Sequence, residues 1–156
     1  TMTFHKFEDI EAWQIAREMC QVVKNCTDKD RFCADWELKK QIKASSGSAM
    51  DCIAEGFERG SRNEFIYFLG VAKGSSGEVR SQAYRALDWG YITEEERQLL
   101  DKLAWRVGAA IQGLIKHLHS TEIKGQRHPV KTLHQVVPPH LNADEKFPSE
   151  PPPFLQ

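Results

Sequence analysis

Four long stretches of this sequence carry apolar residues at every third or fourth position. In the first, Ile10, Trp13 and Ala16 recur at the spacing that places side chains on one face of an α-helix. No stretch shows the alternation of apolar and polar residues that indicates a strand, and short connections make neighbouring helices antiparallel. The predicted fold is therefore all-α, an antiparallel up-down four-helix bundle with helices over residues 9–26, 35–59, 62–88 and 93–119.

Capping residues and glycines mark the ends of these helices. Asp9 is the expected N-cap of the first helix. Ser61 and Thr93 each stand three positions before a glutamate, which is the pattern of a capping box. Gly60 and Gly90 follow the second and third helices, where glycine commonly ends a helix. For the third and fourth helices the sequence therefore predicts where the helix begins, in addition to its apolar face.

Small residues interrupt the interiors of the second and third helices. Residues 44–49 read Ala-Ser-Ser-Gly-Ser-Ala, and glycine costs about 1 kcal/mol against alanine inside a helix. Because the apolar period continues in phase on both sides of Gly47, we expect the helix to continue through it. We expect close packing of neighbouring helices to compensate for Gly47 in the second helix and for Gly70, Gly74 and Gly77 in the third.

The last part of the chain differs in character. Residues 120–156 have no helical period and end in a proline-rich stretch, which predicts an extended or disordered tail after a bundle domain over residues 1–119. The net charge of −1 argues against a strong non-specific nucleic-acid binder. No apolar run is long enough to span a membrane and no signal peptide is visible, so we expect a cytoplasmic protein without a membrane partner.

No constellation of residues predicts catalysis. The carboxylates of Glu55, Glu58 and Glu78 have no nucleophile or metal ligands beside them, and no glycine-rich phosphate loop follows a strand. We therefore expect no enzyme activity, no cofactor and no metal. Reduced thiols are the favoured interpretation of four cysteines without CxxC spacing, with a zinc site or a disulfide scaffold as the alternative: Cys20, Cys26, Cys33 and Cys52.

A long, ordered motif runs through the second and third helices. It begins at Gln41-Ile42-Lys43, continues through Ile53-Ala54-Glu55-Gly56-Phe57, and ends near Gly74-Ser75 and Glu78. The motif resembles the small bacterial four-helix-bundle family named after proteins encoded in intervening sequences of 23S ribosomal RNA genes, and the resemblance covers about residues 4–118. Two positions depart from the family pattern. Ala44 stands where the family tends to have a second basic residue, and Cys52 stands where it tends to have asparagine.

The resemblance implies a ring-like homo-oligomer, a pentamer, without known enzyme activity. A related accessory protein of diversity-generating retroelements works with a reverse transcriptase and RNA. We therefore predict a non-enzymatic, self-assembling scaffold or accessory factor. The alternative is an RNA-binding module linked to ribosomal RNA or to a reverse transcriptase. Four tryptophans are candidates for the core or, beyond its needs, for a subunit interface: Trp13, Trp36, Trp89 and Trp105.

Two sets of polar residues accompany the motif. The first is expected to form a strip that either binds a partner or fixes helix register through hydrogen bonds. The second consists of cations that either contact phosphates or form a solvated helix face with pairs such as Glu55 and Arg59. The strip comprises Gln41, Ser48, Glu55, Ser75 and Glu78, and the cations are Lys39, Lys40, Lys43, Arg59 and Arg62.

Overall fold

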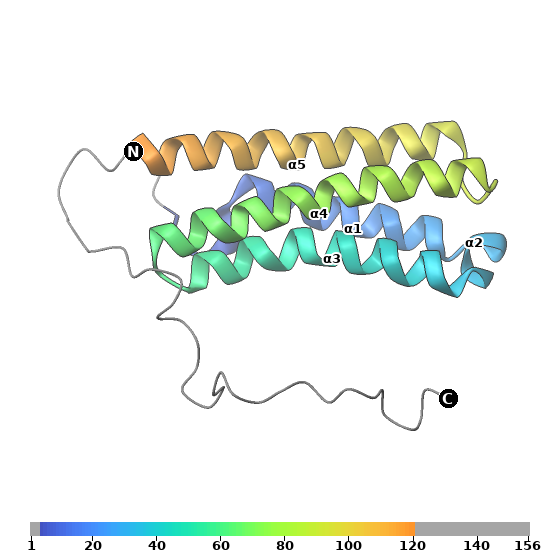
Figure 1. Ribbon diagram of the computed structural model, residues 1–156, viewed down its shortest axis with the longest axis horizontal. Coiled ribbons are helices and arrows are strands. Elements are labelled where there is room, and N and C mark those ends of the chain that lie inside the picture. Colours follow the sequence, from blue (N-terminus) through green and yellow to red (C-terminus); the bar gives the residue numbers. More distant parts are fainter. Residues whose placement is uncertain (1–3, 121–156) are drawn as a thin grey trace, which may run out of the picture. The chain divides into compact units, whose positions relative to one another are not determined.

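Four long helices form the bundle in a computed structural model that describes residues 4–120 (Figure 1). Both α1 and α4 pack against α3 and against α5, so each long helix has two neighbours. The predicted all-α antiparallel bundle is confirmed, and the predicted tail beyond residue 120 lies outside the described residues. The elements are η1 (Phe7–Asp9), α1 (Glu11–Thr27), α2 (Asp30–Ala34), α3 (Trp36–Glu58), α4 (Arg62–Asp88) and α5 (Glu94–Ser120).

The apolar stripes of the four helices meet along the bundle axis. Ile42 and Ile53 of α3, Leu69 of α4 and Ile111 of α5 are each 0% exposed. Burial of such a side chain contributes about 1.5–3 kcal/mol. The period seen in the sequence therefore identifies the faces that form the core.

Capping boxes begin α4 and α5, as the sequence predicts. The Glu96 backbone N–H donates to Thr93 Oγ1 over 3.3 Å, and the Thr93 N–H donates to the Glu96 carboxylate over 2.9 Å. In α4 the Glu64 N–H donates to Ser61 Oγ over 3.5 Å, while the Glu64 side chain turns toward Arg59. The box is thus reciprocal at α5 and one-sided at α4.

Glycines end α3 and α4. Gly60 has φ +72° and Gly90 has φ +75°, in the left-handed region that favours glycine, which confirms both predicted stops. The predicted N-cap of α1 is wrong. Ile10 occupies that position without a side-chain hydrogen bond, because Asp9 is the last residue of η1, one position too early to cap α1.

The short helix α2 was not predicted from the sequence. Its Phe32 is 0% exposed, and the ring stacks on Tyr91 with 5.3 Å between centroids. Five residues are too few to show a helical period. The buried ring joins the α1–α3 connection to the turn between α4 and α5.

The two helices α3 and α4 lie close together at Gly56. A Cβ built there lies 2.7 Å from Phe68 Cβ and 3.4 Å from Phe65 Cα, closer than packing allows at Phe68. The four glycines expected to pack closely lie elsewhere. A Cβ at any of them meets no heavy atom within 4 Å, so that expectation is wrong for Gly47, Gly70, Gly74 and Gly77.

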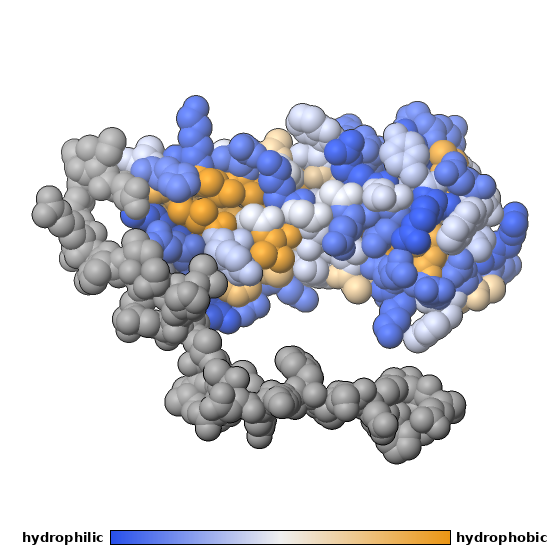
Figure 2. All heavy atoms as spheres, in the orientation of Figure 1, coloured by the Kyte–Doolittle hydropathy of each residue, from blue (hydrophilic) through white to orange (hydrophobic). Residues whose placement is uncertain are grey.

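The surface of residues 4–120 is polar with exposed aromatic rings. Figure 2 shows an apolar patch at the end of the bundle where α5 ends and α4 begins. None of the described helices combines the length and hydrophobicity needed to cross a membrane. Three of the four tryptophans belong to the set of exposed large hydrophobic residues: Trp36, Tyr67, Val71, Tyr84, Trp89, Leu99 and Trp105.

Candidate functional site

Polar side chains line the contact between α3 and α4. Ser48 Oγ lies 2.9 Å from Ser75 Oγ. Nearer the start of α3, Arg85 Nη2 donates to Gln41 Oε1 over 2.7 Å. Because the helices are antiparallel, residue numbers rise along α3 as they fall along α4. Three of the five predicted strip residues therefore meet partners across this contact.

The centre of the strip is Ser45, which is 5% exposed. Its Oγ lies 3.0 Å from both Glu78 Oε2 and the Gln41 carbonyl oxygen, and it accepts a hydrogen bond from Gln82 Nε2 over 2.9 Å. Glu78 is thereby the fourth predicted member of the strip. Ser45, Gln82 and Arg85 were missed as members, since pairing them requires the antiparallel register of the two helices.

Glu55, the fifth predicted member, lies apart from the strip. Its carboxylate is exposed and accepts a hydrogen bond from Arg59 Nη2 over 2.7 Å. At this end of α3 the contact with α4 is apolar, because Phe65 and Phe68 pack directly against Gly56. The strip consequently ends before it reaches Glu55.

These contacts agree with the register-fixing interpretation of the strip. The hydrogen bonds between α3 and α4 each join specific positions on the two helices, and a shift of one helix by one turn breaks all of these together. Buried polar groups left unpaired cost about 1–3 kcal/mol each, so the native register is favoured over its neighbours. Within the described part of the chain, Gln82 Oε1 is a buried atom without a hydrogen-bond partner.

The predicted phosphate contacts fall into two separate groups. Lys39, Lys40 and Lys43 lie in the first half of α3, following the exposed ring of Trp36. Arg59 lies 16 residues beyond Lys43, which corresponds to about 24 Å along a helix. The cations therefore do not form one continuous surface.

The two arginines are less available than the lysines. Arg59 binds the carboxylates of Glu55 and Glu64 and lies 4.9 Å from the Phe68 ring centroid. The hydrogen bond to Glu55 raises the pKa of the guanidinium. Arg62 is half-buried in the first turn of α4. Phosphate binding at Arg59 therefore competes with these ion pairs.

The four cysteines are free thiols in the structure. Burial raises the pKa of Cys26 to about 11, which keeps this thiol protonated at neutral pH. Among residues 4–120, no group of three or more His, Cys, Asp or Glu side chains is placed to hold a metal ion.

Comparison with known proteins identifies one family and one fold. The family model described as 23S rRNA-intervening sequence protein matches residues 8–113. A crystal structure from Bacteroides thetaiotaomicron VPI-5482, of a protein with unknown function from the S23 ribosomal protein family, aligns with a TM-score of 0.62 and 21% identity. The alignment covers 67% of this chain and 95% of that chain. A search of curated proteins finds no significant match.

Proposed function

This chain belongs to the 23S rRNA-intervening sequence protein family, and we propose that it is a cytoplasmic, non-enzymatic scaffold or accessory factor that assembles with itself into a ring. The ring, as a pentamer, is the assembly that the family resemblance implies. Within residues 4–120, a surface with a cluster of exposed aromatic rings supports self-association.

That surface is the aromatic end, which we define as Trp36, Trp89 and Tyr91. Trp36 is 70% exposed and Trp89 is 48% exposed. Trp36 directly follows Asp35, whose carboxylate accepts the Tyr91 hydroxyl, and the Trp89 ring lies 6.1 Å from the Tyr91 ring. Tryptophan and tyrosine are enriched in interface cores, where burial of their rings supplies much of the binding energy.

The test is the mass of the assembly in solution. Native mass spectrometry or light scattering is expected to give a pentamer of the 17.8 kDa chain. A double variant, Trp36→Ala with Trp89→Ala, is expected to dissociate into species with fewer subunits. Trp105→Ala is the matched control, since Trp105 is also exposed but lies in the middle of α5. A monomeric wild type, or a double variant of unchanged mass, contradicts the proposal.

A second candidate function is the binding of single-stranded RNA along α3. Trp36, Lys40 and Lys43 are exposed and spaced by four and then three residues, so they follow one face of the helix. An exposed ring beside cations is the arrangement that stacks a base and contacts the phosphates on either side of it. Family membership gives no independent support, since the departure at Ala44 removes a basic residue next to Lys43.

The RNA proposal is tested by the salt dependence of binding. Fluorescence anisotropy with a labelled uridine oligonucleotide is expected to give an affinity that falls as salt rises. Lys40→Gln with Lys43→Gln is expected to weaken binding and to flatten the salt dependence. Lys102→Gln, an exposed position on α5, serves as the control. Equal affinity of the double variant and the wild type excludes α3 as the RNA surface.

A further inference from the structure

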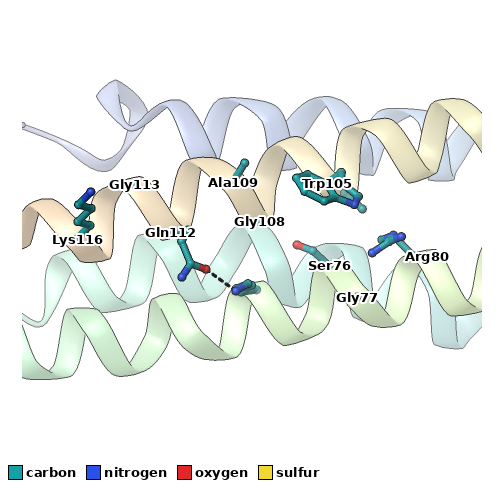
Figure 3. Close-up of a pocket in the computed structure, with 11 residues that line it drawn as sticks. Ser76, Gly77, Arg80, Trp105, Gly108, Ala109, Gln112, Gly113 and Lys116 are labelled. Atoms are coloured by element: carbon teal, nitrogen blue, oxygen red, sulfur yellow. Dashed lines mark hydrogen bonds between the residues drawn. The ribbon is translucent and has the colours of Figure 1, made fainter.

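A groove of about 640 Å³ runs between α4 and α5, away from both the polar strip and the aromatic end. Figure 3 shows Trp105 and Arg80 at one end of this groove and Lys116 at the other. The residues between them are mostly too small to fill the space, and they come from both helices: Ser76, Gly77, Ala104, Gly108, Ala109 and Gly113.

The groove has a definite length and direction. Arg80 Nε donates to Asp101 Oδ1 over 2.7 Å, and Lys73 donates to the Gln112 side chain further along, so α4 and α5 run antiparallel beside it. The α5 wall extends from Ala104 to Lys116, a span of twelve residue steps, or about 18 Å. That length matches about three turns of a helix laid along the groove.

The lining residues carry positive charge only. Lys73, Arg80 and Lys116 line the groove, and no carboxylate does. Asp101 compensates Arg80. Lys73, by contrast, contacts the neutral amide of Gln112, and the Lys116 side chain makes no hydrogen bond or ion pair with any residue from 4 to 120. Two lysines thus leave a positive potential along the groove, which favours an occupant with carboxylates.

The occupant must also present apolar surface. Gly77, Gly108 and Gly113 expose backbone along the groove, and Trp105 remains 62% exposed at its end. Small residues allow another helix to approach closely, and a large ring at the rim covers apolar side chains that enter. A nucleic-acid strand is less suited, since a single aromatic ring offers little stacking for successive bases.

We propose that this groove binds an acidic amphipathic α-helix of another protein. The helix places small and apolar side chains at i, i+3, i+4 and i+7 against the glycines, as amphipathic helices do in hydrophobic grooves. Its flanking carboxylates meet Lys73 and Lys116. This partner surface goes beyond the proposed self-assembly and does not depend on it.

The direct test uses two labelled peptides of about 18 residues, long enough to become helical on binding. Both carry alanine and leucine at the groove-facing positions, and they carry either glutamate or lysine on the flanks. In fluorescence anisotropy the glutamate peptide is expected to bind and the lysine peptide is not. Binding is expected to weaken as salt rises, because exposed charges are screened.

Variants that fill the groove provide the structural control. A Cβ at Gly77 or Gly113 meets no heavy atom within 4 Å, so both positions have room for a side chain and Gly77→Leu with Gly113→Leu is expected to fill the groove. We expect at least ~tenfold weaker binding of the glutamate peptide. Gly74→Leu is the matched control, because Gly74 is equally open but does not line the groove. Since leucine favours helix over glycine, the melting temperature of each variant is expected not to fall.

Four results overturn the proposal. The first is no binding of the glutamate peptide at about millimolar concentration, the weak end of specific affinities. The second is equal binding by the filled variant and the wild type. The third is binding of a uridine oligonucleotide that is lost on filling, which assigns the groove to nucleic acid. The fourth is loss of assembly mass on filling, which makes the groove an interface between copies of this chain.

Discussion

The Tyr91 hydroxyl donates a hydrogen bond of 3.0 Å to Asp35 Oδ2, while Oδ1 of the same carboxylate accepts the Leu38 backbone N–H over 3.0 Å. One carboxylate therefore caps α3 and holds the turn between α4 and α5. The cap hydrogen bond from Leu38 lowers the pKa of Asp35, with the Tyr91 hydroxyl adding to the effect. The Asp35 side chain therefore links the start of α3 to the turn between α4 and α5.

Variants of Asp35 and Tyr91 are expected to lower the melting temperature in proportion to the number of hydrogen bonds that each one loses. Tyr91→Phe keeps the ring stacked on Phe32 and loses only the hydroxyl, which lowers the melting temperature by about 2–5 °C. Asp35→Asn keeps an N-cap acceptor and is expected to have a similar effect. Asp35→Ala loses both bonds and is expected to melt lowest. Thermal unfolding followed by circular dichroism gives the order, and an Asp35→Ala variant as stable as Tyr91→Phe contradicts it.

Gly56→Ala is expected to destabilise the fold, in contrast to alanine at other helical glycines. The added methyl group meets Phe68 Cβ, an atom close to the backbone, so α3 and α4 must move apart. We expect a loss of about 1–3 kcal/mol in unfolding free energy. Gly74→Ala meets open space and is expected to gain about 0.5–1 kcal/mol. Urea denaturation measures the unfolding free energy of both variants. If both variants are stabilised, or both are destabilised, the close packing at Gly56 is contradicted.

Ser45→Ala is expected to destabilise the fold, although it removes only the hydroxyl oxygen. It leaves the Gln82 amide nitrogen without its partner in the contact between α3 and α4, where Gln82 is 9% exposed. The unfolding free energy is expected to fall by about 1–3 kcal/mol. A double variant, Ser45→Ala with Gln82→Leu, removes both polar groups and is expected to recover part of the loss. No recovery contradicts the pairing of these two residues.

The start of α5 is expected to weaken in acid through Glu94. Arg97 binds its carboxylate through two hydrogen bonds of 2.8 Å, and this interaction lowers the pKa of Glu94 from 4.5 to about 2. Because the folded pKa is the lower one, the stabilisation is complete above the unfolded value and is lost as pH falls toward 2. The stability difference between wild type and Glu94→Gln is therefore expected to be constant above about pH 5 and to shrink below it.

Urea denaturation at several pH values measures that difference. Gln98→Ala is a useful comparison, since Gln98 donates only a secondary hydrogen bond of 3.1 Å to the same carboxylate. Its effect is expected to be smaller at every pH. A Glu94→Gln difference that persists unchanged down to about pH 2 contradicts a role for the ionised carboxylate.

Most of the candidate strip was predictable from the sequence, and its centre was not. The seven-residue spacing of Gln41 and Ser48 is enough to place them on one face of a helix. That spacing also predicted Glu55, which lies apart from the hydrogen bonds between α3 and α4, because the pattern of one helix carries no information on what lies opposite. Gln82, the partner of Ser45, is identified only when α3 and α4 are set side by side.

The sequence by itself determined the four long helices, the starts of α4 and α5, the ends of α3 and α4, and the faces that form the core. These features follow from local interactions, such as the capping box at Thr93 and the positive φ of Gly90, together with a regular apolar period. Only the tertiary structure decided which glycine sits at a close contact and which lines open space. Gly56 and Gly77 look alike in the sequence, but the rotation of each helix about its axis turns one toward Phe68 and the other toward the groove.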